Sequence, residues 1–188
     1  MMVWTVAMLT LRSERLEYQP LTEQDWPFFL ALHQDPLVMR YVADARDEDA
    51  IRLLFYVRLP RWEVGSRHWL CLLIRELSTG EPVGVTGCVD RGDGVAEVGF
   101  LLASAFHGKG YGIESLRALC RFAFADAGFR KLTATVTAGN AASKAVLQRA
   151  GFVQEGTLRE SYFLADRWQD DWLFGLLQRE LKERLLLS

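Results

Sequence analysis

Apolar positions in the first hundred residues follow two periods, and each period predicts a different element. Alternation of apolar and polar residues is typical of strands, whereas apolar residues three and four positions apart line one face of a helix. The alternating runs are 11–19, 68–75, 82–90 and 95–102. Short glycine-containing turns join the last three runs, which predicts an antiparallel meander.

Helical patterns fill the space between the first strand and the meander. Thr22 and Asp25 resemble a capping box, and the helix that follows ends before Pro36. A short apolar segment at 38–42 and a second helix at about 48–62 come next. Acidic residues cluster just before and at the start of this helix: Asp44, Asp47, Glu48 and Asp49. They either stabilise the helix N-terminus or attract a cationic amine, and the pattern leaves both interpretations open.

The second half of the chain alternates helices with strands. A helical face with apolar spacing runs from Ile113 to Ala127, with Gly128 as its predicted C-cap. β-Branched alternation predicts a strand at 131–137, and Asn140 is a good N-cap for a helix that ends near Gly151. The last predicted strands are 152–158 and 168–178. Together these elements indicate a mixed α/β (α+β) domain.

Composition narrows the class of protein. A length of 188 residues suggests one domain, and a formal net charge of −2 argues against a nucleic-acid binder. The scattered histidines have no metal-ligand spacing. The widely spaced thiols of Cys71, Cys88 and Cys120 are expected to be free and buried, in a reducing, cytoplasmic compartment. The apolar extension at 1–9 lacks a basic region and is too short to span a bilayer, so no membrane partner is expected.

A glycine-rich stretch, Phe106-His107-Gly108-Lys109-Gly110-Tyr111-Gly112, lies between a predicted strand and a predicted helix. Bare amides at a helix N-terminus bind phosphate, because they meet at the positive end of the helix dipole. The stretch fails the Walker pattern, since Ile113-Glu114 follows the last glycine instead of Lys-Ser or Lys-Thr. It also fails the dinucleotide fingerprint, which needs glycine in place of Ile113 after a βαβ unit.

With these motifs, the sequence resembles the GCN5-related N-acetyltransferases (GNAT), in particular the branch of ribosomal-protein and N-terminal (RimJ/RimL-like) acetyltransferases. The family's acyl-CoA loop matches 107–112, except that His107 replaces the usual Gln or Arg. The opening segments 11–16 and 20–25 match the branch, as do 140–146 and the pairs Gly151-Phe152 and Glu155-Gly156.

The resemblance implies a fold and a donor. We expect one GNAT domain at 10–182, between the N-terminal extension at 1–9 and a C-terminal tail at 183–188. Its sheet would be seven-stranded and mostly antiparallel, with helices on both faces, and would splay between its fourth and fifth strands. Acetyl-CoA would bind in that gap as co-substrate, without a metal. The residues implied to bind it are Phe100, Leu101, Leu102, His107, Gly108, Lys109, Gly110, Tyr111, Gly112, Asn140 and Ser143.

The resemblance also implies catalytic roles. Glu97 is the first candidate for the base, acting through water, although a solvent-facing strand residue explains it equally well. Ser143 would protonate the leaving thiolate, unless it merely belongs to the helix cap. Tyr162 is the alternative acid, and Glu160 and Asp171 are weaker candidates for the base.

The predicted function is transfer of an acetyl group from acetyl-CoA to a primary amine, by direct attack in a ternary complex. A protein N-terminal α-amine is preferred on branch resemblance. A small amine (polyamine, antibiotic or amino acid) and a non-catalytic CoA-binding sensor are the alternatives. The oligomeric state is open, with a homodimer among its forms.

Overall fold

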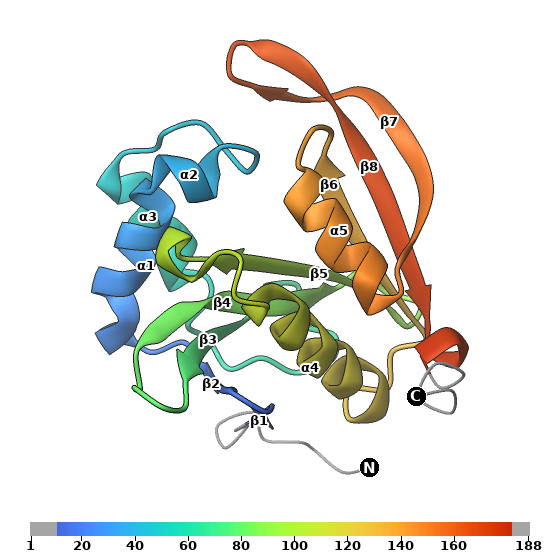
Figure 1. Ribbon diagram of the computed structural model, residues 1–188, viewed down its shortest axis with the longest axis horizontal. Helices are drawn as coiled ribbons and strands as arrows, with labels where there is room; N and C mark the ends of the chain where they lie inside the picture. Colours follow the sequence, from blue (N-terminus) through green and yellow to red (C-terminus); the bar gives the residue numbers. More distant parts are fainter. Residues whose placement is uncertain (1–10, 182–188) are drawn as a thin grey trace.

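A single sheet carries helices on both of its faces in the computed structural model, which describes residues 11–181 (Figure 1). The strands are β1 (Leu11–Arg12), β2 (Leu16–Pro20), β3 (Leu70–Glu76), β4 (Pro82–Asp90), β5 (Val95–Leu102), β6 (Lys131–Thr137), β7 (Val153–Leu164) and β8 (Arg167–Leu177). The α-helices are α1 (Trp26–Gln34), α2 (Pro36–Met39), α3 (Glu48–Tyr56), α4 (Tyr111–Ala125) and α5 (Ala141–Ala150). The predicted extension at 1–9 and the predicted tail at 183–188 lie outside the described residues. The mixed α/β fold class is confirmed.

The sheet has eight strands in the order β1-β2-β3-β4-β5-β6-β8-β7, so the prediction of seven was wrong. The predicted strand at 11–19 is two strands, because the chain reverses at 13–15. There the amide of Ser13 donates to the carbonyl of Leu16 (2.9 Å), and Leu11 then pairs antiparallel with Tyr18. The predicted meander of three antiparallel strands is present as β3, β4 and β5.

The strands β5 and β6 are the parallel pair of this sheet, and they pair over a short distance. Their register runs from Val95 opposite Lys131 to Glu97 opposite Thr133. Beyond these positions the two strands diverge, while β5 stays paired with β4 and β6 stays paired with β8. The sheet therefore splits at the predicted place.

Alternation along β3 fills two separate cores. Leu70, Leu72 and Ile74 pack on the face covered by α4 and α5. Cys71 and Leu73 pack on the opposite face, against α1 and α3. Burial of each such apolar side chain contributes about 1.5–3 kcal/mol, so a strand buried on both faces anchors both layers. The two helix layers are thus fixed relative to one another, because both pack on the same sheet.

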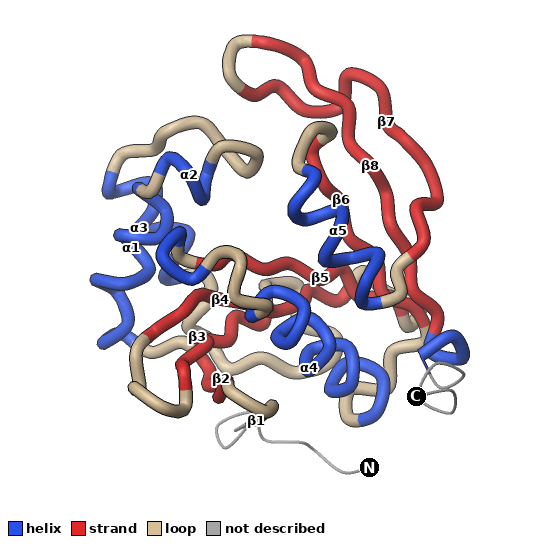
Figure 2. The backbone as a smooth tube through the Cα atoms, viewed as in Figure 1, coloured by secondary structure: helices blue, strands red, loops and turns tan. Residues whose placement is uncertain are grey.

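Several boundaries differ from the predictions for local reasons. The helix predicted at 48–62 ends at Tyr56, and the chain then turns so that Trp62 joins the core on the other face. The apolar segment at 38–42 begins inside α2, which Asp35 caps. β7 is longer than predicted, whereas β8 is shifted by one residue, and the two form a hairpin that extends past the end of β6 (Figure 2). Its turn has Ala165 and Asp166 at positive φ.

Candidate functional site

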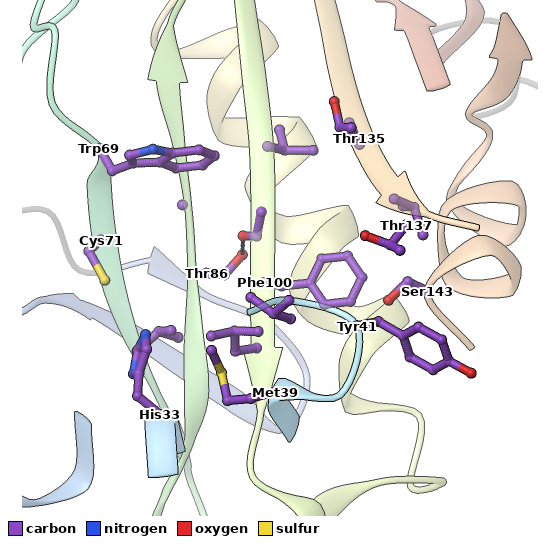
Figure 3. A pocket seen from close by; sticks show the side chains of 18 of the residues that line it. His33, Met39, Tyr41, Trp69, Cys71, Thr86, Phe100, Thr135, Thr137 and Ser143 are labelled. Carbon is purple, nitrogen blue, oxygen red and sulfur yellow. Dashed lines mark hydrogen bonds between the residues drawn. The ribbon is translucent and has the colours of Figure 1, made fainter. Parts of the chain in front are cut away.

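A cavity of about 480 Å³ passes through the sheet where β5 and β6 diverge (Figure 3). Phe29, Met39 and Cys71, which line it, belong to the core on the α1 and α3 side. Val98, Ala134 and Leu147 also line it, and belong to the core on the α4 and α5 side. The split therefore joins the two faces of the sheet, and two molecules entering from opposite faces can meet there.

The glycine loop lies beside this cavity, at the N-terminus of α4. Gly108 and Gly110 have φ of 74° and 81°, a left-handed conformation that glycine adopts without a steric cost. Among residues 11–181, no acceptor is bonded to the amides of 108–113, since the first amide of α4 with a carbonyl partner is that of Glu114. A Cβ on Gly112 would lie 3.4 Å from Val146 of α5, the helix whose Ser143 and Leu147 line the cavity. Free amides at the positive end of a helix form a binding site for phosphate.

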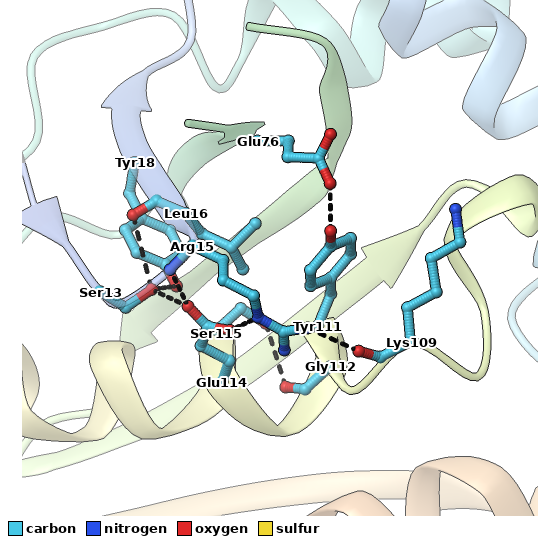
Figure 4. A network of polar contacts seen from close by, with 10 residues as sticks. All are labelled: Ser13, Arg15, Leu16, Tyr18, Glu76, Lys109, Tyr111, Gly112, Glu114 and Ser115. Carbon is cyan, nitrogen blue, oxygen red and sulfur yellow. Dashed lines mark hydrogen bonds and ion pairs between the residues drawn. The ribbon is translucent and has the colours of Figure 1, made fainter. Parts of the chain in front are cut away.

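A network of side chains from the β1–β2 turn fixes the loop (Figure 4). Arg15 donates from Nη1 to the carbonyl of Lys109 (2.9 Å) and from Nε to Glu114 (2.7 Å), and its guanidinium lies 4.5 Å from the centre of the Tyr111 ring. Ser13 donates to the same carboxylate (2.6 Å). Burial raises the pKa of Glu114, but the hydrogen bonds from Ser13 and Arg15 outweigh it and hold that pKa below its usual range. The loop is therefore held open by charge-assisted bonds from outside it.

His107 joins the loop to the end of β5. Its Nε2 lies 2.9 Å from the carbonyl oxygen of Leu102, and because a carbonyl only accepts, Nε2 carries the hydrogen of this bond. A planar donor side chain is what the usual Gln or Arg would also offer. His107 thus ties the loop to the end of β5 and leaves the amides of 108–113 unbonded among the described residues.

The backbone of β5 offers donors to the gap at alternate positions. The amide of Ala103 donates to Val83 of β4 (2.9 Å), so odd-numbered residues of this stretch direct their N–H and C=O groups to β4. Leu101, paired with Val85, follows this direction. Phe100 and Leu102 therefore point their amides away from β4, toward the gap. Of the three predicted backbone contacts, these two remain free for a ligand.

Asn140 and Ser143 lie at the N-terminus of α5 and line the cavity. The Asn140 side chain accepts a hydrogen bond from the amide of Ser143 (3.1 Å), which is the predicted capping bond. The Ser143 side chain lies on the same side of the cavity as Phe100 and Thr137 (Figure 3). The capping bond uses the amide of Ser143 and not its hydroxyl.

Tyr162 and Asp171 line the cavity from the β7–β8 hairpin. The Tyr162 hydroxyl donates to the carbonyl of Val42 (2.9 Å), and Asp171 accepts from the hydroxyl of Ser161 (2.5 Å). Glu160 is exposed at a positive φ of 48° and is not part of the lining.

Glu97 lies on β5 where the sheet is still closed, and it is not part of the lining of the cavity. Its Oε2 accepts hydrogen bonds from Nε and Nη2 of Arg91, at 2.9 and 2.6 Å. An action of Glu97 on a substrate would have to pass through water.

The lining also contains three basic side chains that the sequence pattern does not identify as site residues: His33, Arg46 and Arg58. His33 donates from Nδ1 to the carbonyl of Phe29 (2.8 Å), which leaves Nε2 as the unprotonated nitrogen of a neutral ring. Burial lowers the pKa of His33, and the charges of Arg58 and Arg46 lower it further. No sequence motif identifies these residues as part of a site. They come together at the gap only in the folded chain.

The acidic cluster lies outside the cavity. Asp47 caps α3 through the amide of Ala50, Glu48 pairs with Arg52, and Asp44 accepts from the amide of Ala165. The geometry favours the interpretation as helix-start charges.

Between residues 11 and 181, no group of three or more His, Cys, Asp or Glu side chains could hold a metal ion. No helix in that range is long and apolar enough to cross a bilayer.

Comparisons with known protein families, relatives and solved structures all identify acetyltransferases. The sequence profile of the acetyltransferase (GNAT) domain matches residues 15–153. The chain is 28% identical to the uncharacterized N-acetyltransferase p20 of Bacillus licheniformis, over 92% of this chain and 98% of the relative. It is 29% identical to an FsC-acetyl coenzyme A-N(2)-transacetylase of Aspergillus fumigatus, over 83% of this chain and 70% of the relative. The crystal structure of a spermidine N-acetyltransferase of Vibrio cholerae, in complex with CoA and spermine, has the same fold. It superposes with a TM-score of 0.78 at 19% identity, over 90% of this chain and 99% of the other.

Proposed function

The chain belongs to the acetyltransferase (GNAT) family, and from this premise we propose that it transfers the acetyl group of acetyl-CoA directly to a primary amine. The observation that carries the proposal is the cavity that crosses the sheet at the split between β5 and β6. A ternary complex needs two approaches to one point, and the lining drawn from both cores supplies them. The name of the Aspergillus relative supports the choice of donor.

The free amides of 108–113 fit the pyrophosphate of CoA, because they are main-chain donors at the positive end of α4. The amides of Phe100 and Leu102 would bind the pantetheine arm between the loop and the gap, with Asn140 beside it. Leu101 would contribute its side chain to the cavity wall. The loop glycines leave the main chain uncovered, so that the phosphates can approach it.

Acetyl-CoA would supply the acetyl group as a thioester, whose carbonyl carbon the amine attacks, so that the C–N bond forms while the C–S bond breaks. One of the gap-facing amides of β5 would stabilise the charge that develops on the carbonyl oxygen. The amine approaches from the α1 and α3 side, and the leaving thiolate lies toward Ser143, whose hydroxyl would protonate it. Tyr162 is the second candidate for this acid.

Two groups compete for the role of base. Glu97 would act through water from outside the cavity. His33 lines the acceptor side, and its lowered pKa keeps Nε2 unprotonated near neutral pH. The pH dependence of the rate in variants separates these two residues.

The acceptor side of the cavity argues against a sensor without catalysis, because binding of CoA alone does not need a second opening. Titration calorimetry with CoA, followed by thiol release from acetyl-CoA in the presence of amines, tests the proposal. We expect binding, and thiol release that depends on an added amine. Binding without thiol release for any amine would overturn the enzymatic proposal and favour the sensor.

A further inference from the structure

The acceptor side of the cavity carries fixed positive charge. Arg46, before α3, and Arg58, after it, both line this side together with His33. Asp171 is the carboxylate of the lining within residues 11–181, and it lies at the other end, opposite Thr137 of β6. His33 and Thr137 lie on opposite sides of the cavity in Figure 3.

Arg58 is partly buried, and its charge has no counterpart in the described chain. Its Nη1 donates to the carbonyl of Leu54 (2.6 Å), one bond for a group with five N–H donors. Its side chain makes no salt bridge with any carboxylate of residues 11–181. Burial lowers the pKa of Arg58, as does the charge of Arg46, and the neighbouring thiol of Cys71 stays neutral because burial raises its pKa to about 12. A partly desolvated guanidinium with unused donors fits an anion supplied by a ligand.

Arg46 adds a second, exposed guanidinium to the same side, and no described carboxylate pairs with it. None of the acidic residues of the neighbouring cluster lines the cavity: Glu48 pairs with Arg52, Asp47 accepts from the amide of Ala50, and Asp44 accepts from the amide of Ala165. A cationic polyamine would enter this region against two like charges. A carboxylate would meet two donors with the planar geometry that guanidinium groups bind in bidentate form.

We infer that the acceptor is a primary amine that also carries a carboxylate, which Arg58 and Arg46 bind while the amine points into the gap. This inference rests on the proposed function and names its substrate class. The carboxylate belongs either to a free amino acid or to an acidic residue at the start of a peptide, and the chemistry at the two arginines is the same. Arg58 and Arg46 then determine specificity without touching the thioester.

The test compares matched acceptors by thiol release. Free amino acids are measured against their methyl esters, and an Asp-Ala-Ala amide against an Asn-Ala-Ala amide, with spermidine as the polyamine. We expect the carboxylate member of one pair to exceed its neutral partner in kcat/KM by ~10-fold or more. The pair that responds identifies the source of the carboxylate. Equal rates within both pairs, or a preference for spermidine, would overturn the inference.

Substitutions of Arg58 and Arg46 test whether these residues cause the preference for a carboxylate. Arg58→Gln should reduce kcat/KM for the carboxylate acceptor ~10- to 100-fold and leave the neutral partner within about twofold, whereas Arg58→Lys should retain part of the preference. Arg46→Glu, at an exposed position, should shift the preference toward spermidine even if the Arg58 variants fold poorly. Arg52→Gln is the control, because its guanidinium already pairs with Glu48 on the same helix. An unchanged preference in Arg58→Gln and Arg46→Glu would overturn the assignment.

Failure of the inference differs from failure of the proposed function. Thiol release that ignores the carboxylate leaves an acetyltransferase with another acceptor. No thiol release with any amine, or no binding of CoA, overturns both.

Discussion

The hydroxyl of Tyr162 on β7 donates a hydrogen bond to the carbonyl of Val42, 120 residues earlier in the chain. Two neighbouring features join the same parts of the chain. Asp44 accepts from the amide of Ala165, and the Tyr41 ring lies 3.3 Å from the position that a Cβ on Gly139 would take. The segment between α2 and α3 is thus joined to the β7–β8 hairpin and to the turn after β6, across the split. Its residues Tyr41, Val42 and Arg46 belong to the wall of the cavity.

Tyr162→Phe removes this bond while keeping the ring. Because the hydroxyl hydrogen is directed at Val42, we expect the KM for the amine to rise ~3- to 10-fold with kcat within about twofold, since one hydrogen bond contributes about 1 kcal/mol. Steady-state kinetics with the preferred acceptor measures both constants. A large fall in kcat at unchanged KM would instead identify Tyr162 as the proton donor to the thiolate.

Gly110→Trp should abolish CoA binding in titration calorimetry. The residue lies at φ 81°, and a Cβ would meet Nη2 of Arg15 at 3.3 Å, so the indole would displace the network or cover the free amides. Gly128→Trp is the matched control at the other end of α4, with φ 75° and open space around it. Both variants should lose about 1–2 kcal/mol of unfolding free energy, because a tryptophan is strained in the left-handed conformation. The control therefore matches Gly110→Trp in backbone strain. Equal CoA affinity in the two variants would remove the loop as the phosphate site.

Glu97→Gln tests the predicted base. If Glu97 accepts the proton of the amine through water, the substitution lowers kcat/KM at every pH and flattens its rise toward neutral pH. Arg91→Gln is the control, because it frees the Glu97 carboxylate from its ion pair. A pH–rate profile of Glu97→Gln that superimposes on the wild type would exclude this residue as the base.

The burial of His33 predicts how the stability of the protein depends on pH. Its pKa is lowered by burial from an ordinary value of 6.5, so the folded state binds its proton more weakly than the unfolded state. The associated stability is fully present above pH 6.5 and is lost as the pH falls through the lower pKa of the folded state. Urea unfolding between pH 7.5 and pH 5 should show a decline that His33→Gln reduces. Identical slopes for the two proteins would contradict a neutral, buried His33.

The cysteines should resist thiol reagents until the protein unfolds. Burial raises the pKa of Cys71, Cys88 and Cys120 to about 12, so almost no thiolate is present at neutral pH. We expect slow reaction with a chromogenic disulfide in the native state and rapid reaction of all three thiols in denaturant. Fast labelling of Cys71 in the native protein would show that the acceptor side opens to solvent.

The elements that the sequence predicted well are those with local signals. The meander and the strand at 131–137 carry alternation, and the loop at 107–112 carries glycines that no packing requirement explains. The two-residue strand β1 could not be predicted from alternation, because it exists through a turn that Ser13 and Arg15 stabilise by reaching a carboxylate a hundred residues away.

The residues on the α1 and α3 side of the cavity could not be predicted from local sequence patterns, for a related reason. His33 and Arg58 follow ordinary helical spacing, and they become site residues only because α1 and α3 pack on the face of the sheet that opens at the split. The resemblance to the family predicted the CoA-binding residues through their motifs, whereas the residues proposed to bind the acceptor have no such motif in this sequence. What remained unpredicted was therefore a matter of tertiary placement.

The donors at 108–113 belong to the main chain, and this has a consequence for how the site can change over time. Replacing Lys109 or Ile113 by almost any residue leaves the N–H in position, so the proposed phosphate site can persist while the sequence of the loop changes. An alanine scan would report the strain of losing glycine and little about the ligand. Proline is the one substitution that deletes a donor, and so it is the residue that selection should keep out of this stretch.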